Sequence, residues 1–115
     1  MNAGEKPMED LKAKFDQAMT NVMNARKACL EAKEATIQAK ERLKDQEAGL
    51  INNGLVSGKN EKEREGSMRA QTMKWRDDLA LAEKGERSAV LALEVALDAR
   101  RNSESILKIM ELERI

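Results

Sequence analysis

Apolar and small residues recur from Leu11 to Leu50 at alternating spacings of four and three, without a slip. This pattern is the heptad seam of a coiled coil and predicts one long helix, at about residues 8–52. The seam must pack against another helix. Its members are Leu11, Phe15, Ala18, Val22, Ala25, Cys29, Ala32, Thr36, Ala39, Leu43, Gln46 and Leu50.

The second half of the chain has a similar row of small residues, which predicts a second helix at about residues 61–112. Its members are Leu81, Gly85, Ala89, Ala92, Ala96, Ala99, Ser103, Ile106 and Met110. Because small side chains allow two helix axes to approach closely, we expect a long antiparallel two-helix hairpin. The fold class is therefore all-α, with a single domain over residues 1–115. We assign the hairpin seam to Ala18, Ala25, Ala32, Ala39, Ala89, Ala92, Ala96 and Ala99.

The stretch "LINNGLVSGKNEKERE" is expected to form the turn, at about residues 53–60. Gly54 suits the left-handed residue after a helix, Gly58 lets the loop bend, and Asn60 with Glu63 fits the start of the next helix. A phosphate-binding loop would need a glycine at position 53 and a hydroxyl at position 60, and asparagine stands at both. We therefore interpret the stretch as a turn.

A long Ala/Glu/Lys helix, this turn and a second long helix resemble small helical-hairpin proteins encoded by bacteriophages and prophages. The residues that carry the resemblance are Gly58, Lys59, Asn60 and Arg64. The resemblance implies no activity and assigns no functional residues.

The chain carries 21 basic and 21 acidic residues, which argues against a general footprint for nucleic acid or an anionic membrane. A local basic excess runs from Arg26 to Lys44. We interpret it as a solvated helix face, with nucleic-acid binding as the alternative.

The inventory of reactive side chains predicts no enzyme, no metal site and no cofactor. The chain has no histidine, and its one cysteine, Cys29, lies in the heptad seam, where we expect it to be a buried core residue. Trp75 continues a heptad and is expected in the core, with a stacking platform for bases as the alternative.

The segment "AVLALEVALDA", residues 89–99, is apolar apart from Glu94 and Asp98. Val90, Leu93 and Leu97 need a cover that the first helix cannot supply while its alanines face the hairpin seam. We expect a homo-oligomer, above all a dimer that forms a four-helix bundle. A different protein partner, bound by the methionine-rich surface, is the alternative.

These observations predict a non-enzymatic structural or adaptor protein that self-associates through a helical bundle. The alternatives are a nucleic-acid accessory protein that uses Arg26 to Lys44 and a phage-encoded inhibitor of a host protein. A lone cysteine, a polar start ("MNAGEKPMED") and the lack of a long apolar run predict a cytoplasmic protein without a membrane partner.

Overall fold

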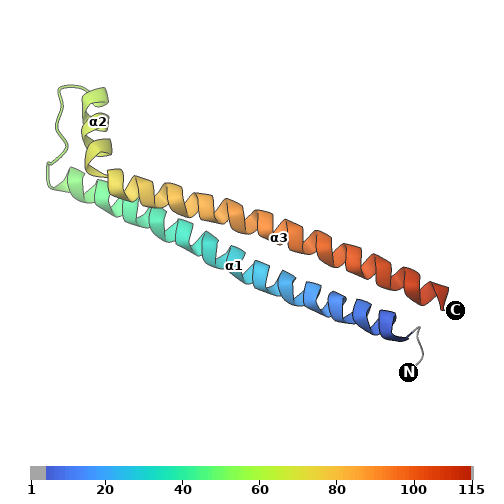
Figure 1. Ribbon diagram of the computed structural model, residues 1–115. Helices are drawn as coiled ribbons and strands as arrows, with labels where there is room; N and C mark the ends of the chain where they lie inside the picture. The colour runs from blue at the N-terminus through green and yellow to red at the C-terminus, as the bar shows by residue number, and fades with distance from the viewer. Residues whose placement is uncertain (1–4, 115) are drawn as a thin grey trace. The chain divides into compact units, whose positions relative to one another are not determined.

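The computed structural model describes residues 5–114, so the polar start of the chain lies partly outside the described residues. The described residues are 91% helical, and they form three helices and no strand. Helix α1 spans Glu5–Asn52, α2 spans Glu61–Gln71 and α3 spans Met73–Glu113 (Figure 1). The two long helices α1 and α3 pack against each other. The prediction of an all-α helical hairpin is confirmed.

Two units make up the hairpin, and each contains part of α1 and part of α3. The terminal unit consists of Met1–Leu30 and Ser88–Ile115. The turn unit is the continuous segment Glu31–Arg87, which includes the loop and α2. We describe the packing of each unit separately.

Helix α1 ends in a Schellman motif. The backbone N–H of Leu55 donates to the carbonyl of Leu50 at 2.9 Å, and that of Gly54 donates to Ile51 at 3.1 Å. Gly54 has a φ of 65°, the left-handed conformation that glycine adopts without steric cost. The structure therefore places Gly54 in the role that the sequence predicts.

Asn60 caps the start of α2. Its side-chain oxygen accepts a hydrogen bond from the backbone N–H of Glu63 at 2.9 Å. The Glu63 carboxylate accepts in turn from the backbone N–H of Lys59 at 2.7 Å. In a standard capping box this second bond would come from the N-cap residue itself, so the motif here extends one residue further into the loop.

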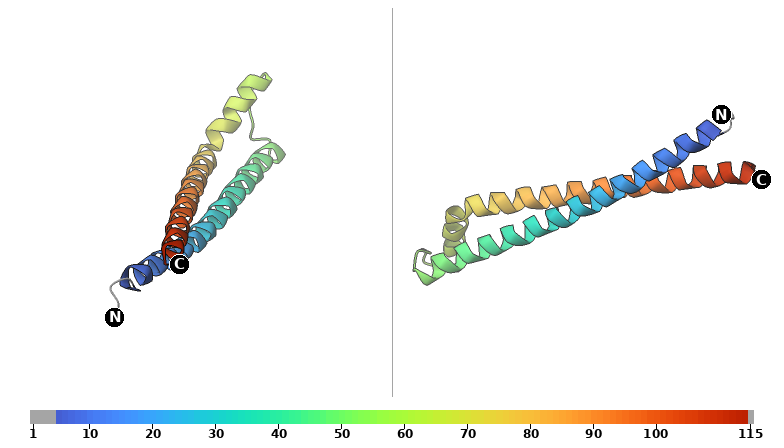
Figure 2. Two further views of the ribbon diagram at one scale, coloured as in Figure 1. Left: turned by 90° about the vertical axis from the view of Figure 1, so that its right-hand side faces the viewer. Right: turned by 90° about the horizontal axis from the view of Figure 1, so that it is seen from below.

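The predicted second helix is divided at Thr72, which is a correction to the expected element at about residues 61–112. Thr72 has φ −108° and ψ 12°, and its hydroxyl donates to the carbonyl of Met68 at 2.8 Å. A threonine bonded to the carbonyl four residues earlier bends a helix. Figure 2 shows α2 at a sharp angle to the start of α3. No glycine or proline marks the bend.

The α1 seam follows the predicted heptad. In the terminal unit, the buried members are Ala18, Val22 and Cys29, and the half-buried ones are Leu11, Phe15 and Ala25. In the turn unit, the buried members are Thr36 and Ala39, and the half-buried ones are Ala32, Leu43 and Leu50. Gln46 is the one predicted member that is exposed. The heptad from Leu11 to Leu50 therefore identifies the packed face of α1.

The packed face of α3 differs from the predicted one. Its main row of half-buried residues continues from the buried Thr72, which precedes α3, at spacings of three and four: Trp75, Leu79, Ala82, Glu86, Ala89, Leu93, Ala96, Arg100, Ser103, Leu107 and Met110. Four further half-buried residues lie outside this row: Arg76, Glu83, Leu97 and Glu104. Ala89 and Ala96 belong to this row, as predicted. Ala92 and Ala99 are exposed, as are Leu81, Gly85 and Ile106, so their assignment to the seam is wrong. The observed row contains large apolar side chains that are half-buried, among them Leu79, Leu93 and Leu107, which favours its packing.

Candidate interaction surface

Helix α3 carries a second heptad row that faces solvent. In the terminal unit this row consists of Ser88, Ala92, Val95, Ala99, Asn102, Ile106 and Ile109, and every member is exposed. None of them is charged. Each member of this row directly precedes a member of the row that faces α1, so the two rows lie about 100° apart around the helix. A helix with two such rows has one packed face and one apolar face that is exposed among the described residues.

Four residues at intervals of seven border this row: Leu91, Asp98, Ser105 and Leu112. Leu91 is 60% exposed, Val95 62%, Ile109 56% and Leu112 69%. We call the row and its border, eleven residues from Ser88 to Leu112, the outer face of α3. Asp98 is its single charged residue and makes an exposed ion pair with Arg101 at 3.4 Å.

The residues predicted as the self-association interface are divided between two environments. Val90 is 37% exposed, at the edge of the α3 surface. Leu93 and Leu97 are half-buried, and Leu93 belongs to the row that packs toward α1. Leu93 therefore lies on the packed side of α3 and is only partly covered within the chain. Leu97 lines a small hollow of about 210 Å³ with Glu94, Asp98 and Arg101.

Helix α1 also has exposed apolar residues in the terminal unit. Met19, Met23 and Leu30 are exposed, and Met23 and Leu30 are one heptad apart. The basic residues from Arg26 to Lys44 are exposed as well, which agrees with a solvated face.

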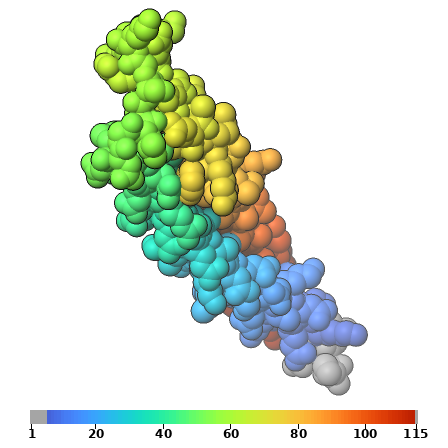
Figure 3. Space-filling view, turned by 90° about the vertical axis from the view of Figure 1, so that its left-hand side faces the viewer, coloured from blue at the N-terminus to red at the C-terminus, as the bar shows by residue number. Residues whose placement is uncertain are grey.

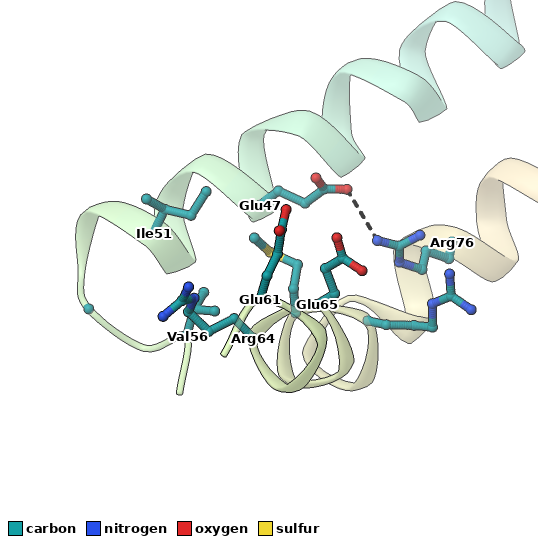
Figure 4. Close-up of a pocket in the computed structure, with 10 residues that line it drawn as sticks. Glu47, Ile51, Val56, Glu61, Arg64, Glu65 and Arg76 are labelled. Carbon is teal, nitrogen blue, oxygen red and sulfur yellow. Dashed lines mark ion pairs between the residues drawn. The ribbon is translucent and has the colours of Figure 1, made fainter. Parts of the chain in front are cut away.

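A cavity lies in the turn unit, where α2 folds against the end of α1 (Figure 4). It has a volume of about 590 Å³. Its lining consists of Glu47, Ile51, Gly54, Val56, Glu61, Arg64, Glu65, Met68, Arg69 and Arg76. On the face drawn in Figure 3, the loop and α2 lie at the surface.

An ion pair joins two walls of this cavity. Arg76 reaches Glu47 at 3.5 Å, and its Nε donates to the Thr72 hydroxyl at 2.9 Å. Glu61 and Glu65 extend from α2 toward the same space (Figure 4). Three carboxylates and three guanidinium groups line the cavity, so its formal charge is balanced. Both partners of the ion pair are about one-third exposed, so the pair contributes at most about 1 kcal/mol.

The remaining candidates for chemistry have structural positions. Cys29 is a buried free thiol in the α1 seam, as predicted. Trp75 is half-buried, with the Lys74 ammonium 5.9 Å from its ring centroid. Within residues 5–114 no group of three or more His, Cys, Asp or Glu side chains could hold a metal ion.

Sequence reasoning missed two features of this surface, the bend at Thr72 and the outer face of α3. The outer face had a detectable signal, because Ser88, Val95, Asn102 and Ile109 repeat every seven residues.

No helix in the described part of the chain is long and apolar enough to cross a membrane. No family model, curated protein or solved structure matches the chain.

Proposed function

We propose that the protein is a non-enzymatic structural or adaptor protein that self-associates through its helices, most simply as a dimer. The observation that carries this proposal is that few apolar side chains are buried while many large ones are exposed. Among the described residues five apolar side chains are buried: Met8, Ala18, Val22, Cys29 and Ala39. Fourteen large apolar side chains are exposed.

The core of one hairpin is small for a stable domain. Of its five buried apolar residues two are alanines, and α2 and α3 contribute none. A chain with so small a core can gain stability from a disulfide, a metal or association. Cys29 has no second cysteine to pair with, so association is the remaining route.

The exposed area supports association as well. The chain exposes 8705 Å². A folded monomer of 12.9 kDa typically exposes about 6,300 Å². The excess of about 2,400 Å² exceeds the area of a standard protein–protein interface, which is about 1,200–2,000 Å² in total. A dimer would remove much of this excess from water.

The proposed role belongs in the cytoplasm, since a single buried thiol needs no oxidising compartment. An adaptor of this kind needs no cofactor, and it acts by holding helices together.

Sedimentation equilibrium from low to high micromolar concentration tests the proposal. We expect a mass of twice 12.9 kDa, with dissociation only on dilution. A helical, cooperatively unfolding monomer at every concentration would contradict self-association. Recovery of a host protein on the immobilised monomer would then favour the alternative function, an inhibitor of a host protein. Salt-sensitive binding of DNA would favour a nucleic-acid accessory protein.

A further inference from the structure

We infer that the outer face of α3 is the self-association surface, and that it binds the same face of a second copy in antiparallel orientation. This inference rests on the proposed function and specifies its interface. The face lies entirely in the terminal unit, between Ser88 and Leu112, and its one charged residue is Asp98.

The spacing of the face fits another helix. Seven uncharged residues repeat at spacings of four and three from Ser88 to Ile109, the pattern of a seam in which side chains of one helix insert between those of its partner. The heptad row of the face is about 100° away from the packed row of α3. A helix at the corner of a four-helix bundle contacts its two neighbours in nearly perpendicular directions, so α1 and a second α3 can pack on α3 together.

Large and small residues are ordered so that the face is complementary to the same face of a second copy in antiparallel orientation. With the two-fold axis between Arg100 and Arg101, the row residues from Ala92 to Ile109 meet where their numbers sum to 201, and the border residues beside them meet where their numbers sum to 203. The resulting pairs are Leu91 with Leu112, Ala92 with Ile109, Val95 with Ile106, Asp98 with Ser105, and Ala99 with Asn102.

This register satisfies both packing and polarity. Every large apolar residue of the outer face meets an apolar residue of the partner, and the small Ala92 faces the larger Ile109, which keeps the distance between the helix axes even. The Asp98 carboxylate meets the Ser105 hydroxyl, which can donate a hydrogen bond to it. In a parallel register, alanine would meet alanine and isoleucine would meet isoleucine. The helix spacing would then alternate between narrow and wide.

The exposed area also identifies a second copy of the chain as the partner that covers the outer face of α3. The exposed excess of about 2,400 Å² is a property of every copy of the chain, and a symmetric contact removes part of it from both copies at once. The outer face contributes five of the fourteen exposed large apolar residues, more than α1 contributes in the same unit.

A charge substitution on each apolar face distinguishes this surface from others. Val95→Glu changes the centre of the outer face, and Leu30→Glu is the matched control on α1, since both side chains are more than 60% exposed. We expect Val95→Glu to raise the dissociation constant of the dimer at least about 100-fold and Leu30→Glu to change it less than about threefold. Circular dichroism should show that both variants keep the helicity of the parent.

The outcomes separate the inference from the proposed function. If the parent chain is a monomer, both are wrong. If the parent is a dimer and Val95→Glu remains one, the chain self-associates through another face, and the inference alone is overturned. Dissociation by Leu30→Glu, without dissociation by Val95→Glu, would move the interface to α1.

Disulfide cross-linking tests the orientation in a Cys29→Ala background. A mixture of Val95→Cys and Ile106→Cys chains should form a mixed disulfide after subunit exchange, because residues 95 and 106 meet across the antiparallel contact. Either variant alone should stay reduced, since two copies of residue 95 would lie about 16 Å apart, beyond the reach of a disulfide. Cross-linking of each variant with itself, and not of the mixture, would indicate a parallel contact and overturn the register.

Discussion

Two loop glycines have positive φ angles, but they differ in what surrounds them. Gly54, at 65°, has open space where a Cβ would lie. Gly58, at 147°, would place a Cβ 2.7 Å from the backbone nitrogen of Arg64 and 2.7 Å from the Cβ of Glu63. Gly58 is thus constrained by both conformation and space, and it lies directly beside the N-cap of α2. The glycine is needed because the loop returns closely onto the first turn of the helix.

Gly58→Ala is therefore expected to destabilise the start of α2 by at least about 1 kcal/mol, since the backbone must shift. Gly66→Ala is the matched control within the same helix. A Cβ at Gly66 meets nothing within 4 Å, so we expect this change to stabilise α2 by about 0.5–1 kcal/mol. Hydrogen exchange of the α2 amides measures both effects. Equal protection in the two variants would show that the close approach at Gly58 is easily relieved.

At the scale of the elements, the α1 seam depends on small side chains at its most buried positions. Ala18 is 6% exposed and lies one turn from Val22, which is 1% exposed. We expect Ala18→Leu to destabilise the hairpin by about 1–3 kcal/mol, because added methylene groups have no space in a close helix contact. Ala28→Leu, at an exposed position of the same helix, should change stability by less than about 0.5 kcal/mol. Urea unfolding checks the pair, and a more stable Ala18→Leu would indicate a cavity at this seam.

The bend between α2 and α3 depends on the Thr72 side chain. Thr72 is fully buried, and its hydroxyl donates to Met68 and accepts from Arg76. We expect Thr72→Ala to cost about 1–2 kcal/mol, because two hydrogen bonds are lost in a buried position. Thr20→Ala is the control, since Thr20 makes the same kind of bond to Asp16 on an exposed face and should cost less than about 0.5 kcal/mol. Urea unfolding compares the two. A similar loss in both would mean that the bend has no special dependence on Thr72.

The elements also show what sequence alone can establish. The heptad from Leu11 to Leu50 has one register, so the packed face of α1 could be predicted. In α3 two neighbouring heptad rows both contain alanines: Ala89 and Ala96 belong to one row, and Ala92 and Ala99 belong to the other. Alanine fits a seam or a surface equally well, so the choice depends on which row carries the larger residues along its whole length. The bend at Thr72 involves a residue that is tolerated within helices, and only its hydrogen bonds reveal it.

At the scale of the whole molecule, the balance of charge predicts how assembly responds to salt. The chain has equal numbers of basic and acidic residues, and the outer face of α3 has one charged side chain. Association through such a face is driven by removal of apolar surface from water, which sodium chloride does not screen. Folding and assembly should also be coupled, because the core of a single hairpin is small.

We therefore expect the thermal midpoint to rise by a few degrees for each tenfold increase in protein concentration, because only the folded chain dimerises. At fixed protein concentration, the midpoint should change little between low and moderate sodium chloride and should rise in sodium sulfate, which strengthens apolar burial. Differential scanning calorimetry measures each dependence, and Val95→Glu is the control in which the concentration dependence should disappear. A midpoint that falls steeply with sodium chloride would mean that ion pairs, such as those available to the basic residues from Arg26 to Lys44, hold the assembly together.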